Sequence, residues 1–215
     1  MVHGLESSLT TLVKDNNMSK IIWQTHECLY EELPELYKSN SKTWIENFPD
    51  WEYRYSSSKD RDSFIEEFYP EYIKLYRFIG PGIYRADFWR YLVIYEFGGL
   101  YADMDSIYNP VWVNPNRVLD FSKDINVSIN VDVGYQNAWI FAKPKNPVIK
   151  KVIESMIEGC QNFYDQGGVS NSMWVRATGP DMYTKVINDN IDLVHLAAFP
   201  VEHAGKYKHE SDIMV

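Results

Sequence analysis

A patterned helix that leads directly into a short apolar strand most constrains how this chain can fold. Residues 81–97 repeat apolar side chains at helical spacing. The members of one apolar face are Phe88, Tyr91, Leu92 and Tyr95. The Gly98-Gly99 pair that follows is typical of a helix end that needs a left-handed residue. Residues 100–105 then read Leu-Tyr-Ala-Asp-Met-Asp, which predicts a strand lying beside that helix.

Two aspartates end this predicted strand. Because alternate residues of a strand point to the same side, we expect Tyr101, Asp103 and Asp105 on one face. Two adjacent carboxylates repel each other, and hard oxygen ligands suit Mg²⁺ or Mn²⁺ with substrate phosphates completing the shell. An isolated Asp-x-Asp is more often a pair that faces water. Here Asp87 and Arg90 lie three residues apart on the preceding helix, so four charged side chains can converge on one cleft. A surface ion pair is the alternative for Asp87 and Arg90.

The rest of the sequence alternates strands with helices. We expect strands at 21–23, 51–55, 126–133, 138–142 and 193–196. We expect helices at 34–46, 64–79 with a break at Pro70, 147–160 and 181–188, and a polar loop at 56–62. This alternation predicts an α/β fold with a mixed sheet. Residues 1–17 are interpreted as a leader or loose extension, with a short docked helix as the alternative, and residues 18–215 as one domain.

Charge and cysteine content narrow the class of protein. The 215 residues include 21 Lys and Arg against 30 Asp and Glu, a net charge of −9. An acidic chain is a poor partner for nucleic acid or an anionic membrane, and it needs a local cation to bind a phosphate. Two cysteines, Cys28 and Cys160, make neither a disulfide framework nor a zinc site. The sequence predicts no membrane span and no signal peptide, so we expect a cytoplasmic protein.

The stretch YRADFWRYLVIYEFGGLYADMD, residues 84–105, resembles the sugar-binding region of the Asp-x-Asp glycosyltransferases of family 32. That family includes yeast Golgi mannosyltransferases, and the glucosylating domains of clostridial toxins are distant relatives. Weaker similarity at 20–26, 44–53, 137–144 and 178–180 extends the resemblance over most of residues 18–200. The chain is similar to short soluble members from bacteria and from large DNA viruses of algae. A viral member is expected in the host cytoplasm.

The resemblance implies a GT-A type fold, an α/β architecture in which helices flank a mixed central sheet. It implies a retaining transferase that uses Mn²⁺ or Mg²⁺. The expected donor is a nucleoside diphosphate sugar, with a UDP-sugar favoured over a GDP-sugar. The expected acceptor is a glycan or a protein-linked glycan. A divalent ion also explains how a chain with a net charge of −9 binds an anionic donor.

Residue roles follow from the same resemblance. Asp105 is expected to ligate the metal directly, and Asp103 to reach it through water or to hold the ribose. Asp87 and Arg90 are expected to hold hydroxyls of the donor sugar. Tyr101 is expected to lie against the nucleotide. The resemblance therefore places the catalytic groups on the helix and strand described first.

Further donor-site residues are implied outside this stretch. The resemblance implies that Gln24 and Thr25 contact the base and that Tyr84 belongs to the nucleotide-sugar site. It also implies that Gln136 or Asn137 faces the donor sugar. The family usually opens H-Q-x-W, whereas residues 23–26 read Trp-Gln-Thr-His, so His26 stands where the family has a tryptophan that stacks on the base. The tail histidines, His203 and His209, are candidates for a third metal ligand.

Two other classes of function share the Asp-x-Asp signal. A Mg²⁺-dependent phosphatase with an aspartate nucleophile also carries it at a strand end, but close to its N-terminus and with a later acidic pair. The helix that bears Asp87 and Arg90 argues against that class. A non-catalytic module that binds nucleotides or glycans is the other alternative, although both aspartates are intact.

Overall fold

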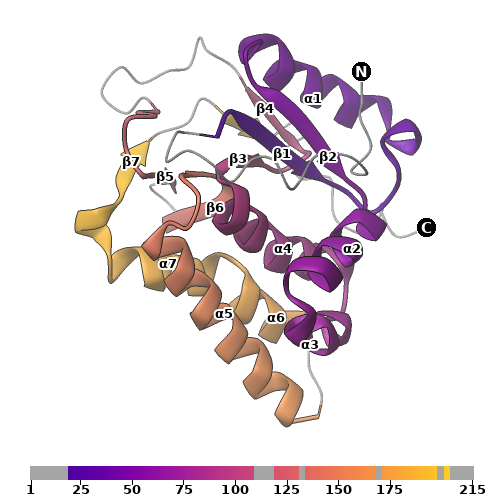
Figure 1. Ribbon diagram of the computed structural model, residues 1–215, viewed down its shortest axis with the longest axis vertical. Helices are drawn as coiled ribbons and strands as arrows, with labels where there is room; N and C mark the ends of the chain where they lie inside the picture. The colour runs from indigo at the N-terminus through magenta and orange to yellow at the C-terminus, as the bar shows by residue number, and fades with distance from the viewer. Residues whose placement is uncertain (1–18, 109–118, 131–133, 168–170, 198–200, 204–215) are drawn as a thin grey trace.

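The computed structural model describes residues 19–108, 119–130, 134–167, 171–197 and 201–203. Its centre is a six-stranded sheet with helices on both faces (Figure 1). The interpretation of residues 1–17 and the candidate His209 lie outside the described residues. The α/β architecture with a central sheet is confirmed.

The sheet is mixed, as its neighbour pairs show. The strands are β1 (Ile21–Thr25), β2 (Glu52–Ser56), β3 (Gly99–Ala102), β5 (Ile125–Asn130), β6 (Gly134–Ala142) and β7 (His195–Ala197), in the order β2-β1-β3-β6-β5-β7. β1 pairs in parallel with β2 and β3, whereas β6 runs antiparallel to β3 and β5. A second, two-stranded sheet joins β4 (Ser106–Tyr108) to β8 (Val201–His203).

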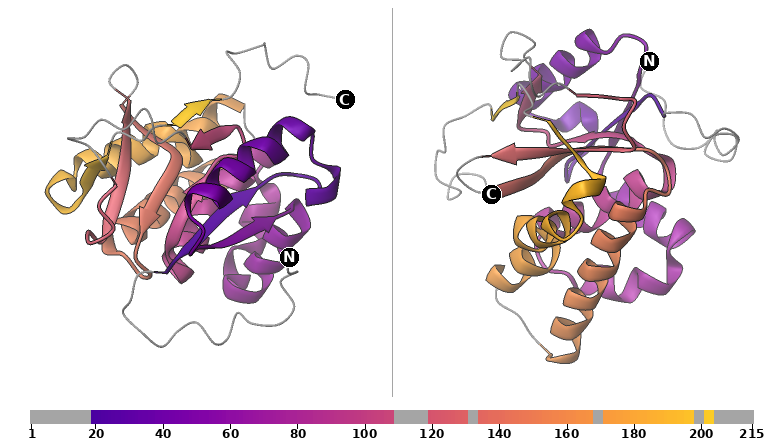
Figure 2. Two further views of the ribbon diagram at one scale, coloured as in Figure 1. Left: turned by 90° about the horizontal axis from the view of Figure 1, so that it is seen from above. Right: turned by 90° about the vertical axis from the view of Figure 1, so that its left-hand side faces the viewer.

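The helices divide unequally between the two faces of the sheet (Figure 2). One face is covered by α1 (Glu35–Asn47). The other face is covered by α2 (Ser58–Phe68), α3 (Ile73–Phe78), α4 (Gly82–Phe97), α5 (Pro147–Asp165), α6 (Asn171–Thr178) and α7 (Pro180–Asn188). Short 3-10 turns occur at Tyr30–Glu32, Pro70–Tyr72 and Ile191–Leu193.

Two apolar cores follow from the alternation of side chains along the strands. Trp23 and Tyr101 belong to the larger core, which is shared with α4 and α5. Ile22 and Leu100, their neighbours in sequence, belong to a smaller core that includes Trp44 of α1. Because successive strand residues point to opposite faces, β1 and β3 serve both cores at once. The central strands are therefore buried on both sides.

Several helix predictions need correction. The expected loop at 56–62 is wrong, because α2 begins at Ser58. Ser57 and Asp60 form a capping box in which the Ser57 side chain accepts a hydrogen bond from the Asp60 backbone N–H, and this pair begins the helix. Helix α6 was not predicted. Leu36, within the helix expected at 34–46, is 55% exposed and does not belong to the core.

The expected glycine turn is confirmed and joins α4 to β3. Gly98 has a φ of +67° and Gly99 a φ of +99°, which favour glycine. A Cβ at Gly98 would lie 2.6 Å from Cδ of Pro144. The Trp23 indole N–H donates to the Gly98 carbonyl at 2.9 Å. The predicted strand, however, is shorter than expected, because β3 ends at Ala102, before both aspartates.

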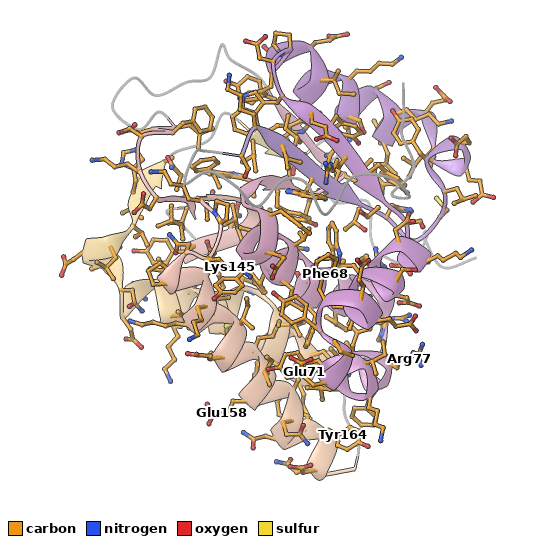
Figure 3. All side chains as sticks on the ribbon, in the orientation of Figure 1. Phe68, Glu71, Arg77, Lys145, Glu158 and Tyr164 are labelled. Atoms are coloured by element: carbon orange, nitrogen blue, oxygen red, sulfur yellow. The ribbon has the colours of Figure 1, made fainter. Side chains whose placement is uncertain are left out.

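A surface groove of about 270 Å³ lies between α3 and α5. Figure 3 labels Glu71 and Tyr164, which line it together with Tyr72, Lys74, Leu75, Ile157 and Gln161. None of the predicted site residues contributes to this groove. Among the described residues, no helix combines the length and apolar character needed to cross a bilayer.

Candidate functional site

Arg90 connects the two carboxylates that the sequence placed on neighbouring elements. Its guanidinium lies 2.8 Å from Asp87 on the same helix and 3.1 Å from Asp103, which follows β3. The Tyr101 hydroxyl donates to Asp103 at 2.6 Å, and the guanidinium lies 4.5 Å from the centre of the Tyr101 ring. Arg90 is 3% exposed, so this is a buried charge cluster and not a surface ion pair. The glycine turn makes the contact possible, because it folds β3 back beside α4.

A buried amide and two hydroxyls surround Asp87. The Asn137 Nδ2 donates to Asp87 at 3.1 Å and to the Tyr91 hydroxyl at 2.8 Å. The Thr178 hydroxyl lies 3.3 Å from Asp87, and the Tyr91 hydroxyl donates to the Thr178 carbonyl at 3.0 Å. The Asn137 carbonyl in turn accepts from Arg90 at 2.6 Å. Asp87 is therefore held from α4, β6 and the end of α6.

Burial sets the protonation behaviour of this cluster. Burial raises the pKa of Asp87 to about 6, although the Arg90 guanidinium opposes the shift. For Arg90 itself, burial lowers the pKa, but the neighbouring groups Asp103, Tyr101, Asp87 and Tyr91 together raise it by more, so the guanidinium stays protonated. The cluster thus presents a fixed positive charge between two carboxylates at neutral pH.

The two aspartates of the Asp-x-Asp sequence occupy a turn, not a strand. The Ser106 N–H donates to the Asp103 carbonyl at 3.0 Å, which closes a turn over residues 103–106. Asp105 is exposed, whereas the intervening Met104 is 5% exposed. The expectation that Tyr101, Asp103 and Asp105 share one strand face is wrong for Asp105, because the extended backbone stops at Ala102. The carboxylates still lie on one turn, two residues apart.

The donor set of this turn fits a hard divalent cation. Asp103 and Asp105 offer carboxylate oxygens of the kind that Mg²⁺ and Mn²⁺ prefer, and such ions commonly take the rest of their shell from phosphates and water. Among the described residues, no group of three His, Cys, Asp or Glu side chains could hold a metal ion. The backbone of His203 pairs with Ser106, the residue after Asp105. Metal ligation by His203 stays a prediction.

The end of β1 carries the residues predicted to meet the base. Thr25 is 6% exposed, and its hydroxyl donates to the Ser56 carbonyl and accepts from Arg61, both at 2.6 Å. His26 is half-buried, its ring centre lies 5.2 Å from that of Tyr37, and burial lowers its pKa. Contact of Thr25 and His26 with a base stays a prediction.

Three other predicted site residues are buried or half-buried. Gln24 is 0% exposed. Its Nε2 donates to the Asp103 carbonyl at 3.1 Å, and its Oε1 accepts from the Tyr53 hydroxyl at 2.9 Å. Gln24 therefore lies beneath the turn and not on a surface that a base would contact. Tyr101 is likewise 1% exposed, which places it under Arg90 and not against a nucleotide. Tyr84 is half-buried in the first turn of α4 and packs on the core.

Of the two alternatives for the donor sugar, Gln136 is half-buried and Asn137 is 8% exposed with its amide already engaged by Asp87 and Tyr91. The Asn137 amide therefore positions Asp87, and Gln136 is the more accessible of the two; contact of either residue with a donor sugar stays a prediction.

The sequence patterns did not indicate several buried residues that form hydrogen bonds to the predicted site residues. Arg61 is 1% exposed and bonds the Thr25 hydroxyl, the His26 carbonyl and the Glu27 carboxylate. It lies in the segment that was predicted as a loop, so its inward direction was not expected. Thr178 begins the 178–180 segment of the resemblance, but no local pattern indicates its contact with Asp87.

Known proteins resemble this chain in sequence. Residues 34–120 match the family model described as "Glycosyltransferase sugar-binding region containing DXD motif". The chain is 33% identical over 108 residues to the initiation-specific alpha-1,6-mannosyltransferase of Candida albicans, across 46% of this chain and 28% of that protein. It is 26% identical over 166 residues to inositol phosphoceramide mannosyltransferase 2 of Schizosaccharomyces pombe, across 73% of this chain and 44% of that protein. The chain thus spans less than half the length of these two relatives.

The fold has a counterpart among solved structures. The ligand-free glycosyltransferase domain from the YGT toxin superposes with a TM-score of 0.59 at 10% identity, covering 86% of this chain and 81% of that one. The predicted GT-A type fold is confirmed, and so is the resemblance to the Asp-x-Asp glycosyltransferases. The two sequence relatives are fungal, and the expected viral or bacterial source stays a prediction.

Proposed function

Since this chain carries the sugar-binding region of the Asp-x-Asp glycosyltransferases, we propose that it transfers a sugar from a nucleoside diphosphate sugar to a glycan acceptor. The observation that carries the proposal is the position of Arg90, buried between Asp87 and Asp103 at the base of the Asp-x-Asp turn. Asp87 in this cluster has a pKa raised by burial, and buried charged groups with perturbed pKa values concentrate at functional sites.

Metal dependence is part of the proposal. Asp105, exposed on the turn, is the direct ligand, and Asp103 is the second carboxylate. A divalent ion held there supplies stabilisation of the negative charge that develops on the leaving diphosphate. Mn²⁺ is the first ion to test and Mg²⁺ the second.

The buried side chains have a different role, which is to hold the donor sugar. The Asp87 carboxylate accepts hydrogen bonds, and the Arg90 guanidinium donates them, so together they match the hydroxyls of a sugar ring. Their mutual ion pair and the Asn137 amide keep them in place before the sugar arrives. Such preorganisation lowers the cost of orienting the donor for transfer. We propose that the transfer retains the anomeric configuration.

The donor has two parts that can be tested separately. A UDP-sugar is the favoured donor and a GDP-sugar the second. Mannose is the first sugar to test, because both sequence relatives are named mannosyltransferases. The acceptor is proposed as a glycan, free or protein-linked.

The test is calorimetric titration of UDP and GDP in Mn²⁺ and in a chelator, with wild type and Asp105→Ala. We expect one nucleotide to bind with Mn²⁺, and binding to weaken at least tenfold in the chelator or in the variant. Incubation with the matching nucleotide sugars then measures release of the nucleoside diphosphate, and NMR of the product reports the anomer. Asp50→Ala is the matched control, because Asp50 is an exposed aspartate in the turn before β2.

Each alternative has its own outcome. Absence of binding by either nucleotide in every condition would overturn the proposal. Release of inorganic phosphate from a phosphomonoester would favour the phosphatase. Metal-dependent nucleotide binding without turnover of any sugar nucleotide would favour the non-catalytic module.

A further inference from the structure

We propose that helix α1 positions the metal-binding turn, with Asn40 as the principal positioning residue. This inference rests on the proposed function, because it concerns the metal that the Asp-x-Asp turn would hold. It assigns to a helix outside the Asp87–Arg90 cluster a direct influence on metal affinity. None of its residues was singled out by the sequence patterns for such a role.

Three side-chain N–H groups hold the backbone of the turn. Gln24 of β1 donates to the Asp103 carbonyl at 3.1 Å. Asn40 of α1 donates from Nδ2 to the Met104 carbonyl at 2.9 Å, and Trp44, one helical turn later, donates from Nε1 to the Ser106 carbonyl at 2.9 Å. The carbonyls on both sides of Asp105 are therefore bonded to α1.

The two aspartates depend on different supports. Asp103 is held by the sheet and its neighbours, since its N–H donates to the Ala138 carbonyl at 2.8 Å and its carboxylate contacts Arg90 and Tyr101. The main sheet does not reach Asp105, because β3 ends at Ala102. The backbone that presents the Asp105 carboxylate is bonded to α1 instead. Metal binding by Asp105 should therefore respond to changes in α1.

A buried asparagine inside a helix lowers the stability of the fold unless its amide forms a hydrogen bond. It is 2% exposed and lies inside α1, where asparagine is a poor helix former and a buried amide without a partner destabilises the fold. Its hydrogen bond spans 64 residues of sequence. Asn47 on the same helix is exposed and bonds only within its helix, to the Thr43 carbonyl at 2.8 Å. Asn47 is therefore a matched control.

The physical effect is preorganisation of a ligand. A turn fixed before the ion arrives loses little conformational freedom on binding, whereas a released turn must be ordered at that moment. Groups that orient metal ligands typically contribute about 10- to 100-fold to metal affinity. We expect the Asn40 bond to lie at the lower end, because Trp44 holds the next carbonyl.

The test measures Mn²⁺ affinity directly, by the EPR signal of free Mn²⁺ during titration of the metal alone into the whole chain. Asn40→Ala and Asn40→Asp should each weaken Mn²⁺ binding about tenfold, and Asn47→Ala should leave it unchanged. Asn40→Asp keeps the shape of the side chain but replaces the donor by an acceptor. Trp44→Phe, which removes the indole N–H and keeps an aromatic ring, should also weaken binding.

A second readout separates positioning from general damage. In transfer assays, the Asn40 variants should need about tenfold more Mn²⁺ for half-maximal rate, with kcat at saturating Mn²⁺ close to wild type. Thermal unfolding in chelator shows whether each variant is folded, and Trp44→Phe provides the test if both Asn40 variants unfold.

Folded Asn40 variants that bind Mn²⁺ as tightly as wild type would overturn the inference. In that case, a loss of Mn²⁺ binding in Asp105→Ala would still support the proposed function. Wild type that does not bind Mn²⁺ alone would overturn the inference, whereas the proposed function is overturned only if neither nucleotide binds.

Discussion

Asp87 illustrates how burial changes the chemistry of one carboxylate. Its pKa is raised from 3.8 to about 6, because burial disfavours the charged form by more than Arg90 and two hydrogen bonds favour it. The folded state therefore binds a proton at pH values where the unfolded chain has released it. The stability that Asp87 contributes is fully present below about pH 4 and is lost as the pH rises through 6.

Asp87→Asn should remove this pH dependence. A shift of about two pKa units corresponds to about 3 kcal/mol. Between pH 4 and pH 7, the free energy of unfolding of wild type should therefore fall by about that amount relative to the Asn variant. Urea denaturation at several pH values measures the difference. The same substitution should reduce transfer strongly, because the amide lacks the charge that pairs with Arg90.

Asp50→Asn is the control for this experiment, because Asp50 is exposed. Its stability difference from wild type should stay constant across the same range of pH. An equally constant difference for Asp87→Asn would show that Asp87 is ionised in the folded state with an ordinary pKa.

At the scale of elements, the junction between α4 and β3 determines the site. Gly98 ends the helix at a φ of +67°, and the chain then enters β3 beside β1 and β6. This reversal brings Arg90 within 3.1 Å of Asp103, although 13 residues separate them in sequence. The local geometry of one glycine therefore sets the distance between Arg90 and Asp103, the groups proposed to hold the sugar and the metal.

Gly98→Ala should destabilise the protein by more than Gly167→Ala. Both glycines have positive φ, +67° and +72°, and the ψ of −167° at Gly98 lies in a region that is nearly exclusive to glycine, so both substitutions carry a backbone cost of about 1–3 kcal/mol. Only at Gly98 would the added Cβ meet another atom, Cδ of Pro144 at 2.6 Å, whereas no atom lies within 4 Å of a Cβ at Gly167. We expect about 2 kcal/mol or more of additional loss at Gly98.

Urea denaturation of the two variants tests this comparison. Mn²⁺-dependent nucleotide binding should also weaken in Gly98→Ala and stay unchanged in Gly167→Ala. Equal losses of stability would mean that Pro144 moves aside at little cost, and that the junction is not closely packed.

At the scale of the whole molecule, one hydrogen-bond network joins the late helices to the site. Tyr91 of α4 accepts from the Asn137 amide and donates to the Thr178 carbonyl at the end of α6. The same Asn137 amide bonds Asp87. Segments up to 91 residues apart thus meet at one carboxylate. The late helices consequently contribute to the position of Asp87, which is proposed to hold the donor sugar.

Tyr91→Phe should break this connection, and Tyr183→Phe provides a matched control. The two rings are both buried and stack with centres 5.8 Å apart. Loss of the Tyr91 hydroxyl leaves the Thr178 carbonyl without its donor, for which we expect about 1–3 kcal/mol of lost stability and a higher KM for the donor. The Tyr183 hydroxyl is buried and has no hydrogen-bond partner among the described residues, so its removal should be neutral or stabilising.

Thermal and urea unfolding with donor kinetics measure both variants. A loss of stability in Tyr183→Phe equal to that in Tyr91→Phe would show that the rings, and not the hydroxyl network, connect the two halves. An unchanged KM in Tyr91→Phe would show that Asp87 keeps its position without the network.

Local patterns in the sequence determined most of the elements, but not α6 or the start of α2, and most of the charged cluster. The spacing of apolar residues gave α4, the Gly98-Gly99 pair marked its end, and the i, i+3 spacing paired Asp87 with Arg90, because these features depend on the backbone of one segment. The alternation of strands and helices likewise predicted the mixed α/β sheet. The same reasoning placed the aspartates on a strand, although the extended backbone ends at Ala102.

Only the tertiary structure decided which side chains hold the site from behind. Asn40, Arg61 and Thr178 act through hydrogen bonds that span 64, 36 and 91 residues, and no local pattern indicates such partners. It also decided exposure, placing Gln24 and Tyr101 behind the site and Asp105 at the surface. Burial depends on which elements pack on a residue from elsewhere in the chain. That dependence is why the sequence could indicate which charged residues form the candidate site, while only the fold determined their burial and their hydrogen-bond partners.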